Sequence, residues 1–95
     1  MAEIRRLVMD VLKPHEPGII EITEKLAEIE GVKGVNSTLI EVDEEVKNLK
    51  ITVEGEISEE EVRKIIENEG ASIHSVDEVV AGKEFVEKTE TPQDK

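Results

Sequence analysis

The spacing of apolar residues changes abruptly near the start of the chain, and this change constrains the fold more than any other feature. In residues 4–12, the apolar residues Leu7, Met9 and Val11 alternate with Arg6, Val8 and Asp10, which is the period of a strand. Residues 13–18, KPHEPG, contain two prolines and a glycine and cannot continue a strand. After this loop the apolar residues recur at helical spacing, at Ile19, Ile22, Leu26 and Ile29. The sequence therefore predicts a strand followed by an amphipathic helix.

The rest of the chain adds three strands and a second helix. Residues 35–43 and 49–55 predict two strands of a hairpin, joined by an acidic turn. Ser58 and Glu61 have the spacing of a capping box that opens a helix ending near Gly70. A last strand is predicted over residues 71–82.

This order of elements has one common compact solution. Two right-handed β-α-β units interlock into an α+β, ferredoxin-like βαββαβ sandwich. The expected antiparallel sheet has the order 4-1-3-2 and carries both helices on one face. The expected domain covers residues 1–82, and residues 83–95 form a C-terminal extension.

Charge and composition exclude several kinds of partner. The chain has 24 acidic and 12 basic residues, and its formal net charge of −12 repels phosphate backbones and anionic lipid heads. We therefore expect no nucleic acid and no membrane partner. The absence of cysteine excludes disulfides, thiol catalysis and iron–sulfur clusters. The first 16 residues contain no long apolar stretch, so we expect a cytoplasmic protein. Abundant Glu and Lys fit a heat-adapted source.

The chain lacks the residues that two well-known functions of this fold require, RNA binding and the transport of soft metal ions. A four-stranded sheet that binds RNA stacks bases on aromatic side chains of its central strands, and residues 5–11 and 49–55 contain none. A carrier of soft metal ions would need paired cysteines in the first loop, which reads KPHEPG. Both uses are excluded.

Apolar residues on the strands indicate self-association. We expect several members of one set to lie on the sheet face away from the helices, namely Val8, Ile40, Val42, Val76 and Val80. A half-apolar open face on a small domain usually meets another copy, so a homo-oligomer is predicted. The extension carries Phe85, the only aromatic residue of the chain, which would dock on a neighbour or add a strand to its edge.

Polar residues should gather at one end of the sheet, where the KPHEPG loop, the hairpin turn and the start of the last strand meet. The candidate ligand-binding residues there are Asp10, His15, Gly18 and His74. Asp10 and His74 lie on neighbouring strands, so an Asp–His pair could orient an imidazole as a base or metal ligand. The structural alternative is a hydrogen bond or an interface contact. No firm cofactor is predicted, but hard cations such as calcium or magnesium bind oxygen clusters. The candidate metal ligands are Asp43, Glu44, Glu45, Asp77 and Glu78.

Two family resemblances bear on these expectations. Residues 16–35, EPGIIEITEKLAEIEGVKGV, resemble the start of an ACT-type regulatory domain, which implies an amino-acid ligand near Gly18. A second resemblance spans nearly the whole chain, through VLKPHEP (11–17), GVNSTLIEVD (34–43), SIHSVDEVVAG (72–82) and TPQD (91–94). These segments resemble a family of small archaeal proteins classed as domain of unknown function 211. That resemblance implies a ferredoxin-like fold in self-associating subunits and no established activity.

The leading hypothesis is a non-enzymatic, self-assembling domain that senses a small ligand or a divalent cation. An ACT-like amino-acid-binding module is the first alternative. A hydrolase or transferase that uses the Asp10–His74 pair is the second.

Overall fold

Four strands and two helices follow one another in the order that the sequence predicts. The computed structural model describes residues 3–87. Its elements are β1 (Ile4–Pro14), α1 (Ile19–Ala27), β2 (Val32–Val42), β3 (Val46–Ile57), α2 (Glu59–Asn68) and β4 (Ser72–Ala81). Of the expected C-terminal extension, residues 83–87 are described and residues 88–95 lie outside the described part.

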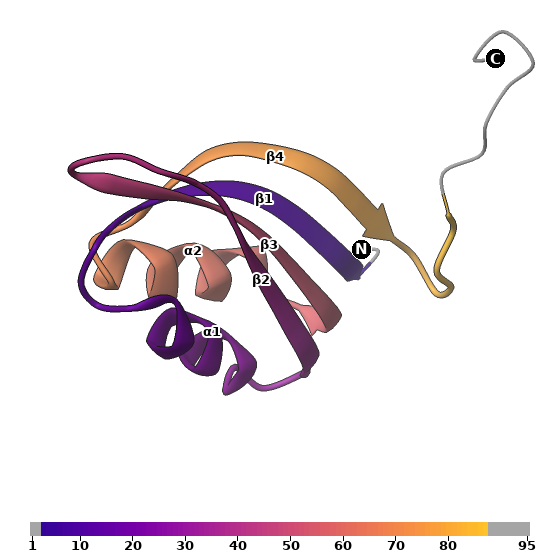
Figure 1. The fold of residues 1–95 in the computed structure, drawn as a ribbon. Coiled ribbons are helices and arrows are strands. Elements are labelled where there is room, and N and C mark those ends of the chain that lie inside the picture. Colours follow the sequence, from indigo (N-terminus) through magenta and orange to yellow (C-terminus); the bar gives the residue numbers. More distant parts are fainter. Residues whose placement is uncertain (1–2, 88–95) are drawn as a thin grey trace, which may run out of the picture.

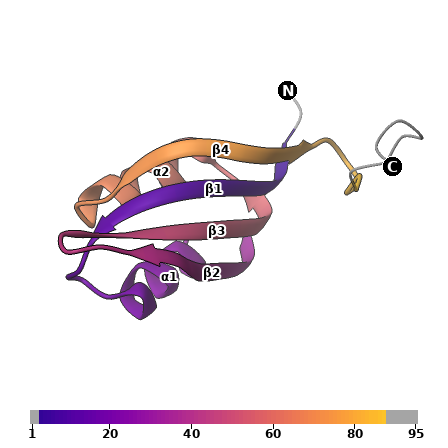
Figure 2. The same ribbon diagram turned by 45° about the horizontal axis from the view of Figure 1, so that its top comes forward.

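The four strands form one antiparallel sheet of order β2-β3-β1-β4, which is the predicted order 4-1-3-2 read from its other edge. Figure 1 shows both helices against the same face of this sheet. Figure 2 shows the strands side by side, with β1 and β3 in the middle and β2 and β4 at the edges. The predicted ferredoxin-like α+β fold is confirmed.

The core lies between the sheet and the two helices, and the strand periods place it correctly. Alternate residues of the two central strands face the helices and are buried, as predicted: Leu7, Met9, Val11, Leu49, Ile51 and Val53. The helices contribute Ile22, Leu26, Val62 and Ile66, which are fully buried. Because both helices bury an apolar stripe on one sheet face, the opposite face stays free of helices.

Gly31 and Gly55 allow the chain to pass from α1 into β2 close to β3. Both have positive φ, +94° and +137°, a region that L side chains rarely adopt. The backbones touch here, since Glu56 N–H donates to the Gly31 carbonyl at 2.7 Å. A Cβ on Gly31 would overlap the Glu56 carbonyl, and a Cβ on Gly55 would overlap the Gly31 carbonyl. This crossing therefore requires glycine on both sides.

The helix-free face is more polar than the sequence suggested. Side chains directly opposite in a ladder share a face, so Val8 and Val80 lie on this face with Thr52 and Arg6. Val76 is opposite Met9, and Val42 is opposite Lys47, so both belong to the helix side. Most of the face is made of charged and polar residues: Arg6, Asp10, Asn48, Lys50, Thr52, Glu54, Ser75 and Glu78. The expected half-apolar face is thus only sparsely apolar.

Most of the exposed large apolar residues instead lie on the two edge strands; the others are Ile20 on α1 and Phe85 and Val86 after β4. The β2–β3 hairpin projects past the helices at the end opposite the described start of the chain (Figure 1). On this edge Leu39, Ile40 and Val42 are about half exposed. Val76 and Val79 on β4 are exposed to a similar degree. Within residues 3–87, neither helix is long and apolar enough to cross a membrane.

Candidate functional site

The loop after β1, the β2–β3 turn and the start of β4 share one end of the sheet, as predicted. Pro14 is opposite Val46, and Leu12 is opposite Ser72. The loop and the turn also touch, because His15 Nε2 donates to the Asp43 carbonyl at 2.9 Å. His15 is therefore held by backbone and lies on the surface of this end.

Asp43 has a structural role in the turn. Its Oδ1 accepts the N–H groups of Glu45 and Val46, at 2.9 Å and 2.8 Å. These backbone hydrogen bonds, led by the one from Val46, lower the pKa of Asp43 because they favour the ionised carboxylate. Glu44 and Glu45 are exposed. Within residues 3–87 no group of three His, Asp or Glu side chains is arranged to hold a metal ion. The calcium or magnesium site stays a prediction.

Asp10 and His74 are not brought opposite each other. The cross-strand neighbours of Asp10 are Lys50 on β3 and Ser75 on β4. His74 is an extra residue in a β-bulge, between Ile73, which is opposite Val11, and Ser75. One oxygen of Asp10, Oδ1, is buried without a hydrogen-bond partner. Within residues 3–87, no hydrogen bond joins this oxygen to His74, so the predicted Asp–His dyad is not formed there.

Asp77 binds a lysine across the sheet. It is the extra residue of a second bulge, and its carboxylate accepts Lys50 Nζ at 2.6 Å and Ser75 Oγ at 2.7 Å. Both contacts lower the pKa of Asp77, and the hydrogen bond from Lys50 has the larger effect. The same hydrogen bond raises the pKa of Lys50. Both oxygens of this candidate metal ligand are thus occupied by protein donors.

Gly18 directly precedes α1 and has open space around it, since no atom lies within 4 Å of where a Cβ would sit. Beside it runs a mostly apolar groove of about 250 Å³ between α1 and β2, lined by Ile19, Ile20, Thr23, Glu24 and Ser37. Ile20 is 72% exposed, and Thr23 Oγ1 donates to Ser37 Oγ at 2.7 Å. This groove is the concave apolar feature nearest to the predicted ligand site.

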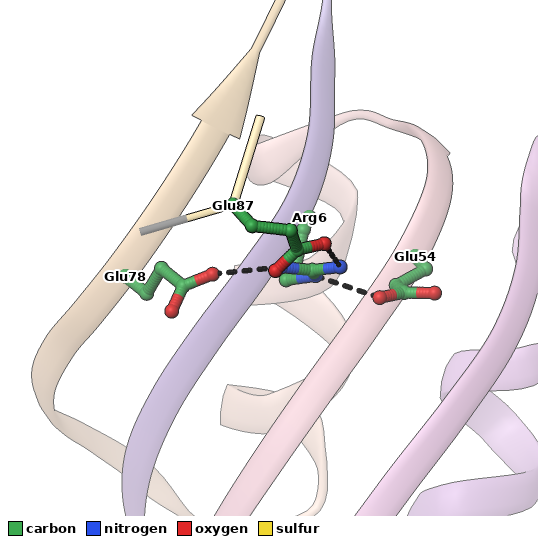
Figure 3. A network of polar contacts seen from close by, with 4 residues as sticks. All are labelled: Arg6, Glu54, Glu78 and Glu87. Atoms are coloured by element: carbon green, nitrogen blue, oxygen red, sulfur yellow. Dashed lines mark hydrogen bonds and ion pairs between the residues drawn. The ribbon is translucent and has the colours of Figure 1, made fainter. Parts of the chain in front are cut away.

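The most developed polar cluster surrounds Arg6 on the helix-free face (Figure 3). Arg6 Nε donates to Glu54 on β3 at 2.7 Å, and Nη1 donates to Glu78 on β4 at 3.0 Å. The third carboxylate belongs to Glu87, in the segment Lys83–Glu87, which we call the strap. Glu87 accepts from Nη1 at 3.1 Å and from Nη2 at 2.9 Å. The three carboxylates raise the pKa of Arg6, and Glu87 has the largest effect. Arg6 in turn lowers the pKa of Glu87.

The strap adds an aromatic contact to this cluster. The Arg6 guanidinium lies 5.4 Å from the centroid of the Phe85 ring, within cation–π range. Val80, the cross-strand neighbour of Arg6, is only 6% exposed, although it lies on the face without helices. The sequence reasoning missed this cluster. The available signal was an arginine at an outward position of a central strand in a strongly acidic chain.

A second feature that the sequence reasoning missed is a buried charge at the end of β1. Lys13 is fully buried, and its Nζ donates to the Pro14 carbonyl at 2.6 Å. Burial first, and then the nearby charge of Lys47, lower the pKa of Lys13. Glu69 is also buried; Lys25 Nζ donates to its Oε2 at 2.7 Å, while its Oε1 has no hydrogen-bond partner. None of the described grooves opens onto Lys13.

Element order, sheet order and helix placement define a ferredoxin-like α+β protein. Residues 5–95 match the family model DUF211, described as uncharacterized ArCR, and the chain belongs to that family. A relative, Uncharacterized protein MJ0319 of Methanocaldococcus jannaschii, is 49% identical over 96 residues, which cover 100% of this chain and 99% of the relative. The family resemblance drawn from the sequence is confirmed. Neither description states an activity.

Proposed function

We propose that this chain is a self-assembling structural domain whose copies associate through the edges of their sheets. The observation that carries the proposal is the position of the exposed apolar side chains. Within residues 3–87, five of the eight exposed large apolar side chains lie on the edge strands, at Leu39, Ile40 and Val42 on β2 and at Val76 and Val79 on β4, each about half exposed. Edge strands with exposed apolar residues and unpaired backbone groups are templates for pairing with another chain.

The topology favours head-to-tail pairing of β2 with β4 of another copy. β2 runs antiparallel to β3, β3 to β1, and β1 to β4, so β2 and β4 run in opposite directions. A β2 edge placed beside a β4 edge therefore continues an antiparallel sheet and keeps all helices on one side. Such heterologous contacts build rings or filaments rather than isolated dimers. The polar helix-free face is a poorer contact surface than these edges.

The test is the molar mass in solution, measured by light scattering after size-exclusion chromatography. We expect a mass several times that of the 10.6 kDa chain. A charge on either edge, Ile40→Lys or Val76→Lys, should reduce the mass to that of smaller species because it would bury an unpaired ammonium. Thr52→Lys is the matched control, since it adds the same charge to the helix-free face. A wild-type chain that remains a monodisperse monomer at high concentration overturns the proposal.

A second candidate function is a small-ligand module of the ACT type. The groove between α1 and β2 favours it, because it is largely apolar, has a polar pair at Thr23 and Ser37, and adjoins the open space at Gly18. The test is a thermal-shift screen with amino acids. A ligand present at 100 times its dissociation constant adds about 2.7 kcal/mol to the free energy of unfolding. Thr23→Val should abolish a genuine shift, and the absence of any shift across the screen contradicts this candidate.

A further inference from the structure

The Arg6 guanidinium has two sides that serve different partners. Its inner donors, Nε and one hydrogen of Nη1, bond Glu54 and Glu78 from the two neighbouring strands. These carboxylates belong to the sheet and hold the guanidinium plane in place. The outer edge, formed by Nη1 and Nη2, meets one carboxylate with both nitrogens, the geometry that arginine uses for bidentate recognition. The sheet thus presents a preformed carboxylate-binding edge to whatever lies above it.

The occupant of this edge is weakly attached to its own chain. Within the strap, Phe85 is 48% exposed, Val86 is 69% exposed, and the Glu87 side chain is 71% exposed. The strap leaves β4 at Gly82, which has a φ of +119° and no atom within 4 Å of where a Cβ would sit. The Gly82 backbone itself is fixed, since its N–H donates to the Glu3 carbonyl and its carbonyl accepts from Arg5 Nε, both at 2.8 Å. The direction of the strap is therefore set beyond Gly82. Arg6 binds the strap in two ways: it forms an ion pair with Glu87, and its guanidinium lies over the Phe85 ring.

An open groove of about 550 Å³ separates the strap from β4. Its apolar lining comes from Val79, Val80 and Ala81 of β4 and from Val86 of the strap, and its polar lining comes from Asp77, Glu78 and Glu87. Val79 and Val86 are both well exposed within it, so this apolar surface stays in contact with water in a single chain. It continues the apolar edge of β4 that the proposed assembly would cover.

We propose that the strap is exchanged between copies, so that Glu87 and Phe85 of one chain dock on Arg6 of the next. The inference rests on the proposed self-assembly and names one contact within it. Exchange of an identical segment reproduces the same ion pair and ring contact at little cost, and it brings Phe85 and Val86 against a second chain. A free small carboxylate is a poor competitor, because Glu54 and Glu78 already outweigh the charge of Arg6. A strap that the assembly holds beside Arg6 of the next chain has a high local concentration at this edge and so binds where a free carboxylate does not.

The absence of cysteine allows a direct test with two single-cysteine chains. One chain carries Val79→Cys and the other Val86→Cys, on opposite sides of the groove and outside the Arg6 cluster. One variant is isotope-labelled, the two are mixed under conditions that permit subunit exchange, and a short bis-maleimide is added. Intact mass spectrometry then counts mixed pairs and like pairs, while light scattering reports the molar mass of the same sample.

Strap exchange predicts that mixed pairs exceed like pairs several-fold. Glu87→Gln in the Val86→Cys chain should reduce the mixed pairs several-fold, because it removes the charge that Arg6 binds. Glu84→Gln, in the same strap but not among the carboxylates that bond Arg6, should leave them unchanged. A multimeric sample without excess mixed pairs, or with mixed pairs insensitive to Glu87→Gln, overturns the exchange alone. A sample that is monomeric throughout overturns the proposed self-assembly as well.

Discussion

Arg6 and Glu87, which are 81 positions apart in the sequence, are joined by two hydrogen bonds of 2.9 Å and 3.1 Å. Glu87 is the third carboxylate on the same guanidinium, after Glu54 and Glu78 (Figure 3). Phe85 is about half exposed and Val86 is 69% exposed, so the ion pair is the most directional contact between the strap and the sheet. The position of the strap should therefore respond to charge.

Glu87→Gln should release the strap, whether it docks within one chain or between chains. Phe85 is a convenient probe, because its ring protons are the only aromatic signals apart from those of two histidines. In the variant, we expect the Phe85 chemical shifts to move towards those of a free peptide. Glu84→Gln should leave them in place. If Glu87→Gln does not alter the Phe85 signals, the ion pair does not hold the strap.

Acid should release the strap in the wild-type chain. Arg6 lowers the pKa of Glu87 below its ordinary value of 4.5, so the ionised form binds better than the protonated form. The contribution of this contact is complete above pH 4.5 and is lost as the pH falls through the lowered pKa. A titration of the Phe85 signals should show a midpoint below 4.5, and added salt should weaken the docked state. A midpoint at or above 4.5 contradicts the assignment.

Gly55→Ala should be strongly destabilising, because the new methyl group would meet the Gly31 carbonyl at a backbone φ of +137°. A steric clash and an unfavourable φ add, and we expect a loss of about 1–3 kcal/mol or more in the free energy of unfolding. Gly34→Ala is the matched control on β2, where a Cβ meets no atom within 4 Å. Urea unfolding of the two variants measures the difference. Equal stability would mean that the crossing of α1 into β2 relaxes without cost.

The fold was predictable because two periods are clear in the sequence. Alternation places Met9 and Ile51 towards the helices, and helical spacing places Ile22 and Leu26 against them. These periods determine which face of each element is buried, and the element order then leaves few topologies. The same alternation also places Lys13 on the buried side, and this was a usable signal for the buried charge.

The details of β4 were less predictable. Two β-bulges shift its register against β1, so Ser75 rather than His74 is opposite Asp10, and Val76 falls on the helix side. A bulge changes which side chains meet without leaving a mark in the apolar pattern. The Arg6 cluster was equally hidden, since it depends on the path of the strap after Gly82 and joins residues from four separate segments.

Asp43→Ala should loosen the β2–β3 turn. The variant loses the oxygen that accepts the N–H groups of Glu45 and Val46, and we expect a lower melting temperature and faster amide exchange at both positions. Because these bonds lower the pKa of Asp43, their contribution is present above pH 3.8 and is lost as the pH falls through the lowered pKa. Glu44→Ala, at the exposed neighbouring position, should change neither quantity. An unchanged exchange rate in Asp43→Ala would contradict this role.

Lys13→Met should increase stability near neutral pH. The wild-type ammonium is fully buried, its described hydrogen bond goes to the Pro14 carbonyl, and it forms no ion pair within residues 3–87. The nearby Glu16, Glu69 and Glu21 therefore compensate its charge only in part. Methionine fills a similar volume without a charge, and we expect this replacement to raise the free energy of unfolding by up to about 4 kcal/mol. Lys33→Met, at an exposed position of β2, is the control and should have little effect.

The pH dependence distinguishes a desolvated charge from a merely poor packing arrangement at Lys13. Burial lowers the pKa of Lys13 in the folded chain below its ordinary value of 10.5. At a pH between the lowered pKa and 10.5, the unfolded chain therefore holds a proton that the folded chain has lost. Wild-type stability therefore rises with pH in this window, relative to the variant. Urea unfolding at pH 7 and at successive values up to 10.5 should show the advantage of Lys13→Met shrinking. An advantage that stays constant over this range would assign the effect to packing, and a variant less stable than wild type at pH 7 would show that the ammonium stabilises the fold.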